Sequence, residues 1–149
     1  MAQTRSETLA ALRRRRGHSV LEVTFLAPWF FFLFAGAFDM GFYSVAIIST
    51  QNAARVASIH TSSNASTAAD SAAACQYALA ELRSLPNVRS LNSCAALPLQ
   101  VTASAVTGAD GAPASQVSVT YQTPALIPIP NLRGQFTFTR TAQMRVKGS

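Results

Sequence analysis

The sequence predicts an α+β protein with a long N-terminal transmembrane helix that continues into an amphipathic stalk, a second short helix, and a small antiparallel β-sheet of about three strands. Two observations support this fold class. Only 12% of the 149 residues are charged, against about 25% in typical soluble domains. The hydrophobic pattern also changes along the chain, from a continuous apolar run to helical spacing and then to alternation. We therefore expect a leader at residues 1–17, a span and stalk at residues 18–60, and an α+β domain at residues 61–149.

The leader holds much of the positive charge of the chain. Five of the twelve basic residues precede Gly17, and four of them form the run Arg13–Arg16. Residues 18–149 keep seven basic and five acidic residues, so the formal net charge falls from +6 for the whole chain to +2 for this part. Because the basic residues are concentrated in a leader and do not form a binding face, we expect no nucleic-acid partner.

An apolar segment follows, from His18 to Ile48. Glu22 and Asp39 are its only acidic residues, and the stretch Val23–Phe38 has no ionisable group. With its neighbours this stretch makes a helix of about 27 Å, which is enough to cross the hydrocarbon core of a bilayer. The arginine run before it places the N-terminus in the cytoplasm by the positive-inside rule. We expect a single pass through a membrane, with the C-terminal domain facing the periplasm or the exterior.

Helical spacing continues beyond the span and predicts a stalk that ends near His60. A polar stretch rich in Ser, Thr, Asn and Ala then forms a joint. The segment from Asp70 to Leu85 again places its apolar residues on one face, and Pro86 and Asn87 end this second helix.

The chain has two cysteines, Cys75 and Cys94, and both follow the span. Periplasmic proteins keep disulfides, so we expect the two to be bonded. In the chain-entropy model such a bond contributes about 3 kcal/mol. The alternative is a pair of free buried thiols.

Alternation of apolar and polar residues predicts three strands, around Leu99–Ala103, Val117–Tyr121 and Phe136–Val146. Arg140 interrupts the apolar row of the last strand and indicates a sheet edge. Between the last two strands lies the proline-rich link Pro124–Pro130, which cannot be a central strand. It is either an ordered loop over the core or a contact patch for a neighbouring subunit.

The start of the span has an unusual arrangement, in which Gly17 is followed five residues later by Glu22. A carboxylate at the centre of an apolar helix costs about 2.5 to 3.5 kcal/mol on insertion scales, and less near the interface, so Glu22 requires a partner. Cleavage after Gly17 exposes a new amine on His18, and this amine on an adjacent subunit would neutralise Glu22 as helices bundle. The alternative is that Glu22 is a solvated charge at the membrane interface.

These residues resemble a known family. Glycine followed by glutamate at the fifth position is similar to the prepilin signal of type IV pilins. The run RRGHSVLEVTFLAPWFFFLFAGAFDMGFYSVAIISTQNAARVAS resembles the TadE-type minor pilins of the tight-adherence (Flp) pilus system. The matching features are Glu22, Pro28 within the span, Asp39 with Gly41 at its outer end, and the segment from Asn52 to Arg55 beyond it.

The resemblance covers most of residues 13–60 and, more loosely, residues 115–146, where VSVTYQTPALIPIP precedes a threonine-rich strand. It implies a substrate of a prepilin peptidase that is cut between Gly17 and His18. It further implies a minor pilin or pseudopilin that assembles, initiates or caps a filament used for adhesion or secretion. The implied partners are the peptidase, other pilins, Tad inner-membrane assembly components and the lipid bilayer. His18 and Ser19 depart from the pattern because they are polar for the start of a filament helix.

Two further residues of the span have simple interpretations. Pro28 has no backbone N–H and frees the carbonyl of Thr24, so we expect a helix kink there. Unwinding at this site during filament packing is the functional alternative. Asp39 lies where the span reaches the outer surface, and we expect it to be an interface or helix–helix hydrogen-bonding group.

No enzyme motif is present, because the sequence has no P-loop, GxSxG, HExxH or paired-carboxylate pattern. His18 and His60 have no second ligand at metal-binding spacing. We therefore expect no catalytic, metal or cofactor site.

Two other classes of protein fit parts of the sequence. In a secreted protein, signal peptidase would cut after Ala37, because residues 35–37 have the A-x-A form. The apolar sequence continues from Phe42 to Ile48, which argues against this reading. The third class is an uncleaved membrane anchor with a periplasmic binding or scaffold domain. The mature N-terminus separates the three classes, since it would be His18, Phe38 or Met1.

Overall fold

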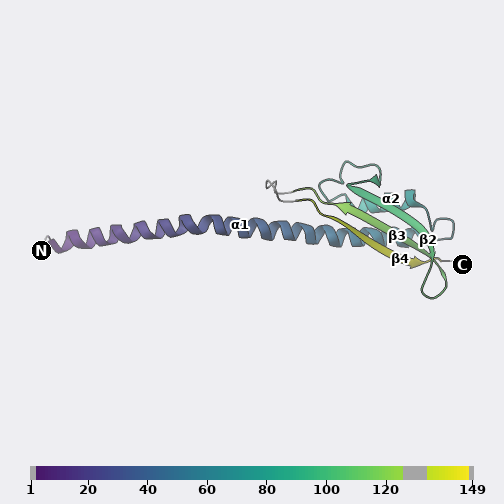
Figure 1. Cartoon of the computed structure of the whole chain (residues 1–149), viewed down its shortest axis with the longest axis horizontal. Coiled ribbons are helices and arrows are strands. Elements are labelled where there is room, and N and C mark those ends of the chain that lie inside the picture. The colour runs from purple at the N-terminus through teal and green to yellow at the C-terminus, as the bar shows by residue number, and fades with distance from the viewer. Residues whose placement is uncertain (1–2, 126–133, 148–149) are drawn as a thin grey trace. The chain divides into compact units, whose positions relative to one another are not determined.

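The computed structural model describes residues 3–125 and 134–147, with side chains from residue 20 onward. The chain divides into two compact units, Met1–Met40 and Gly41–Ser149 (Figure 1). Helix α1 (Gln3–Thr61) contributes to both. The second unit includes the stalk as well as residues 61–149, because one face of the stalk packs on the sheet.

The first unit consists of the N-terminal part of α1 in the residues that the structure describes. Every large apolar side chain between Val20 and Met40 is exposed, and Phe25 and Phe34 each reach 78%. The part of α1 from Val20 is long and apolar enough to cross a membrane. The helix is continuous through Pro28, so the proline does not end it, and the kink stays a prediction.

The second unit adds helix α2 and an antiparallel sheet. The strands lie in chain order across the sheet and are β1 (Ala95–Ala96), β2 (Leu99–Thr107), β3 (Pro113–Gln122) and β4 (Thr137–Arg145). The expected α+β class is confirmed, but the strand count of three is wrong by one. Strand β1 has two residues, paired with Leu99 and Gln100 of β2, and two residues are too few to show alternation.

Strands β2 and β3 form a hairpin closed at Gly108 and Gly111. The amide of Gly108 donates to the carbonyl of Ala112 at 2.8 Å, and the amide of Gly111 donates to the carbonyl of Gly108 at 3.0 Å. Gly111 has a φ of 78°, a conformation that glycine adopts without steric cost. Strand β4 lies at the other side of β3 and is an edge strand, as Arg140 indicates. Residues 126–130 of the proline-rich link are outside the described part of the chain.

Helix α2 (Ser71–Leu82) is shorter than expected. Its N-cap is Asp70, whose side chain accepts hydrogen bonds from the amides of Ala72 and Ala73 at 2.9 and 3.0 Å. The expected end at Leu85 is wrong, because the following Pro86 disfavours helical geometry at Leu85. The chain continues instead in successive turns, in which the amides of Leu85, Val88 and Leu91 each donate to the carbonyl three residues earlier. The side chain of Leu85 is still buried.

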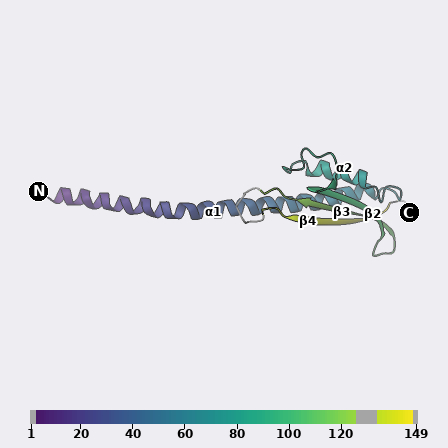
Figure 2. The same cartoon turned by 45° about the horizontal axis from the view of Figure 1, so that its top comes forward.

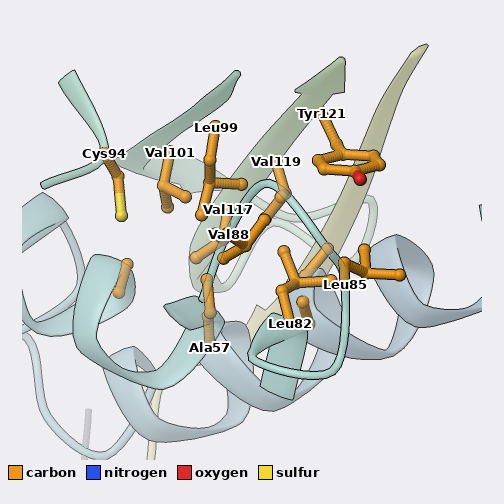
Figure 3. Close-up of a cluster of buried hydrophobic side chains, with 14 of the residues drawn as sticks. Ala57, Leu82, Leu85, Val88, Cys94, Leu99, Val101, Val117, Val119 and Tyr121 are labelled. Atoms are coloured by element: carbon orange, nitrogen blue, oxygen red, sulfur yellow. The ribbon is translucent and has the colours of Figure 1, made fainter. Parts of the chain in front are cut away.

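Both helices contribute to the core on one face of the sheet (Figures 1 and 2). The side of α1 that meets the sheet is made of small residues, namely Ala46, Thr50, Ala53, Ala54, Ala57, Ser58 and Thr61, each at most 1% exposed. The larger buried side chains come from α2 and the strands, among them Leu82, Leu99, Val117, Val119 and Tyr121 (Figure 3). Small residues let α1 approach the sheet closely, and the larger ones fill the rest of the core.

Cys75 and Cys94 form a disulfide, as expected, with an S–S distance of 1.98 Å and a Cα–Cα distance of 5.7 Å. The bond joins α2 to the segment that precedes β1. The amide of Val101 donates to the carbonyl of Cys94 at 3.0 Å, so the disulfide-bonded segment is also tied to β2.

Candidate processing and assembly segment

The expected cleavage site lies inside α1. Gly17 and His18 both have helical backbone conformation. A helical peptide bond is inaccessible to a protease, so cleavage requires local unwinding at this point. Glycine lowers the cost of that unwinding, because it is less favourable than alanine in a helix interior by about 0.5 to 1 kcal/mol.

Glu22 lies four residues beyond His18 and its side chain is exposed. Within the described part of the chain it has no ion pair. Its neighbours on α1 are the exposed apolar residues of the first unit, including Leu21, Val23 and Leu26. None of the side chains that the structure describes pairs with this carboxylate, and its surroundings favour burial in lipid or against other helices.

Asp39 and Gly41 lie on either side of the boundary between the two units. Asp39 is half-buried, and its Oδ1 is shielded from solvent without a hydrogen-bond partner among the described residues. A Cβ added at Gly41 would meet nothing within 4 Å, so packing within the chain does not require glycine there.

Asn52 and Arg55 are exposed on the stalk. Their neighbours Ala53, Ala54 and Ala57 are fully buried against the sheet, so Asn52 and Arg55 lie on the opposite side of α1. The domain does not use either side chain for its core, and both are available to another molecule.

The structure also shows contacts that join α1 to the far end of the chain. The hydroxyl of Tyr43 donates to the carbonyl of Gly134 at 2.9 Å, and its ring lies 4.9 Å from the ring of Phe136 in an edge-to-face arrangement. At the other end of the stalk, the amide of Lys147 donates to the carbonyl of Ser62 at 2.8 Å. Strand β4 therefore runs parallel to the stalk (Figure 1). Sequence periodicity does not predict these contacts, because each one joins residues that are distant in the sequence.

A buried polar cluster holds the end of α1 against β3. Thr61 Oγ1 and Ser115 Oγ are 2.7 Å apart, and the Ser115 hydroxyl is 2.8 Å from the carbonyl of Ala68. Both side chains are buried, so these hydrogen bonds satisfy groups that water cannot reach.

A second polar contact lies at the opposite end of β3. Tyr121 is fully buried, and its hydroxyl donates to Asn87 Oδ1 at 2.5 Å, while Asn87 Nδ2 donates to the carbonyl of Gln122 at 2.6 Å. Burial raises the pKa of Tyr121 to about 12. The residue therefore stays neutral at physiological pH.

The chain matches no family model, and no curated protein or solved structure is significantly similar to it.

A cavity of about 390 Å³ lies beside the disulfide. Its polar lining is neutral and includes Gln76, Asn92 and Ser93. In the described residues no group of three or more His, Cys, Asp or Glu side chains is placed to hold a metal ion. The arrangement of charges and apolar surface along α1 is therefore a stronger indication of function than this cavity.

Proposed function

We propose that the chain is a TadE-like minor pilin or pseudopilin that takes part in assembling, initiating or capping a tight-adherence (Flp) type IV pilus. The observation that carries this proposal is the order of features at the start of the chain: a basic leader, Gly17, Glu22 five residues later, and a long apolar helix. A prepilin peptidase requires such a leader, and the acid gains a partner only after cleavage frees the amine of His18.

Three structural features support the proposal. Exposed aromatic and aliphatic side chains surround the first unit, so α1 requires lipid or other helices as a cover. The second unit carries a disulfide, which fits an oxidising compartment such as the periplasm. The stalk adds an exposed polar pair, Asn52 and Arg55, that the domain does not use.

In this proposal the resting protein is held in the bacterial inner membrane by one span, with the N-terminus in the cytoplasm and the second unit in the periplasm. Its partners are the prepilin peptidase, other pilins, the Tad assembly components and the bilayer. The chain acts as a structural component and not as an enzyme.

The deciding experiment is mass spectrometry of the mature N-terminus in a host with a prepilin peptidase. We expect the mature chain to begin at His18, and the variant Gly17→Val to keep its leader. The substitution Gly36→Ala, at a glycine where an added Cβ meets nothing within 4 Å, serves as the control and leaves processing unchanged. A mature chain that begins at Phe38 would support a secreted protein, and one that begins at Met1 a membrane anchor; either would overturn the proposal.

A further inference from the structure

The outer side of the stalk carries a row of exposed residues at helical spacing. We name it the outer stripe, and it consists of Val45, Ile48, Asn52, Arg55 and Ile59. Val45 is 56% and Ile48 61% exposed, although both lie in the compact second unit. The small residues that pack on the sheet occupy the other side of α1. The outer stripe is therefore an unused helix face with three apolar residues, an amide and a cation.

A second row lies on α1 within the first unit. We name it the span stripe, and it consists of Trp29, Phe32, Gly36 and Asp39. Trp29 is 72% and Phe32 66% exposed, and a Cβ added at Gly36 meets nothing within 4 Å. Asp39 ends the row with a half-buried carboxylate, whose Oδ1 is shielded from solvent and has no hydrogen-bond partner among the described residues. The span stripe therefore consists of two aromatic side chains, a glycine that leaves space for a neighbouring side chain, and the carboxylate of Asp39.

The four residues of the span stripe correspond to the first four residues of the outer stripe at a constant offset of sixteen positions. The offset matches Trp29 with Val45, Phe32 with Ile48, Gly36 with Asn52, and Asp39 with Arg55. Apolar residues thus meet apolar residues, the amide meets the glycine gap, and the anion meets the cation. The order of charges gives the match a direction, since only a parallel arrangement brings Asp39 to Arg55 while the apolar residues also meet.

We propose that the span stripe of one copy packs against the outer stripe of a second copy, with Asp39 of the first paired to Arg55 of the second. This inference rests on the proposed function, because copies that share one membrane are parallel and a filament brings them together. The matched stripes require one copy to be displaced outward along the helix by about 24 Å. The contact therefore forms only as the span of one copy leaves the bilayer, and it covers apolar surface that lipid covered before.

Charge also argues against a symmetric pair of copies at equal height. In such a pair Arg55 would face Arg55 and Asp39 would face Asp39, and like charges at a contact repel. The offset contact instead uses two different faces, so each copy keeps one free stripe for the next. A contact of this heterologous kind extends into an open chain.

Cysteine crosslinking tests the predicted neighbours. The double variant Gly36→Cys with Asn52→Cys keeps the native disulfide, so its new thiols are the only free ones among the cysteines of the chain. After mild oxidation of exported filaments, we expect a ladder of crosslinked copies on a non-reducing gel. The control pair Ala37→Cys with Asn52→Cys moves one thiol about 100° around the helix and should give no ladder.

The outcomes separate this inference from the proposed function. A processed and exported chain that gives no ladder, or equal ladders for both pairs, overturns the contact and leaves the proposed function standing. A crosslink that joins the chain to a different protein also overturns it, because the partner is then not a second copy. A chain that keeps its leader and is never exported overturns both.

Charge exchange provides a second test of the same contact. We expect Asp39→Asn and Arg55→Gln each to lower the exported fraction at least about tenfold, because each leaves one charge unpaired in the contact. The exchanged variant, Asp39→Lys with Arg55→Glu, should recover most of that loss. An exchanged variant no better than the single variants contradicts the pairing.

Discussion

Two polar side chains, Glu22 and Tyr121, differ in their exposure and in their partners. Glu22 lies among exposed apolar residues of α1 and has no ion pair within the described chain. Tyr121 is buried in the core and keeps its hydroxyl hydrogen-bonded to Asn87. The described side chains supply no ion-pair partner for Glu22, and the proposal assigns that role to another copy, whereas Tyr121 has its partner within the chain. Their substitutions therefore have different expected effects.

We predict that Glu22→Ala leaves processing after Gly17 largely intact and impairs incorporation into filaments. The peptidase acts at the leader, while the carboxylate acts later, when it meets an amine of a neighbouring copy. The measurement compares the mature N-terminus with the exported fraction. The isosteric variant Glu22→Gln is the control for shape and should show the same defect, because it also removes the charge. Normal incorporation of either variant would contradict the pairing role.

We predict that Tyr121 makes folding stability fall at high pH. Its pKa of about 12 in the folded protein is above its ordinary value of 10.0. The contribution is therefore complete below pH 10 and is lost as the pH rises from 10 to 12, by about 1.4 kcal/mol per pH unit at most. Denaturant unfolding of the full chain in detergent micelles at several pH values measures this loss. In Tyr121→Phe the free energy of unfolding should fall less between pH 10 and 12, because the variant lacks the Tyr121 contribution. The control Tyr77→Phe should lose as much stability over this range as the wild-type chain. An equal dependence of stability on pH in all three proteins would contradict the prediction.

The elements of the fold were largely predictable from periodicity, and the failures have physical causes. Helix α1 ends at Thr61, close to the expected His60, because a polar joint follows it. Strand β1 is not predictable in this way, because a strand of two residues shows no periodicity. Helix α2 ends before Leu85 because proline acts on the residue that precedes it.

In the candidate site, too, single residues were predictable from the sequence, whereas hydrogen bonds between distant segments were not. Asp39 is predicted from its place at the outer end of the span, and Asn52 and Arg55 from the resemblance to TadE-type pilins; the structure adds how far each side chain is exposed. The pairs Tyr43 with Gly134, and Thr61 with Ser115, were not predictable. Such hydrogen bonds depend on which elements meet in space, and hydroxyl groups occur too often for a sequence to single out a pair.

We predict that α1 tolerates no larger residue on its side facing the sheet. Ala57 is fully buried among residues of both helices and the strands, so Ala57→Leu should lower the free energy of unfolding by about 1 to 3 kcal/mol through overpacking. The matched control is Gln51→Leu on the exposed side of the same helix, which should change stability by less than about 0.5 kcal/mol. Denaturant unfolding in micelles compares the two. Equal effects would show that the small residues are not required for close packing.

At the scale of the whole molecule, the second unit combines a small core with covalent and polar ties between its layers. The disulfide joins α2 to the segment before β1, and hydrogen bonds tie the end of α1 to β3 and to the residues that follow β4. Much of the core surface of α1 comes from alanine and hydroxyl side chains, which bury little apolar area. A unit of this kind depends on crosslinks more than one with a large aliphatic core does.

We therefore predict that the variant Cys75→Ser with Cys94→Ser lowers the free energy of unfolding by about 3 kcal/mol, the value expected for a loop closed across nineteen positions. The loss reflects the greater freedom of the unfolded chain, so the native arrangement of α2 and the strands should remain. Denaturant unfolding of the full chain in micelles, with and without a reducing agent, measures the effect. Reduction should destabilise the wild-type chain to the level of the variant and leave the variant itself unchanged. If the variant and the wild-type chain unfold at the same denaturant concentration under oxidising conditions, the disulfide does not stabilise this unit, and the buried hydrogen bonds and the core alone would have to hold its layers together.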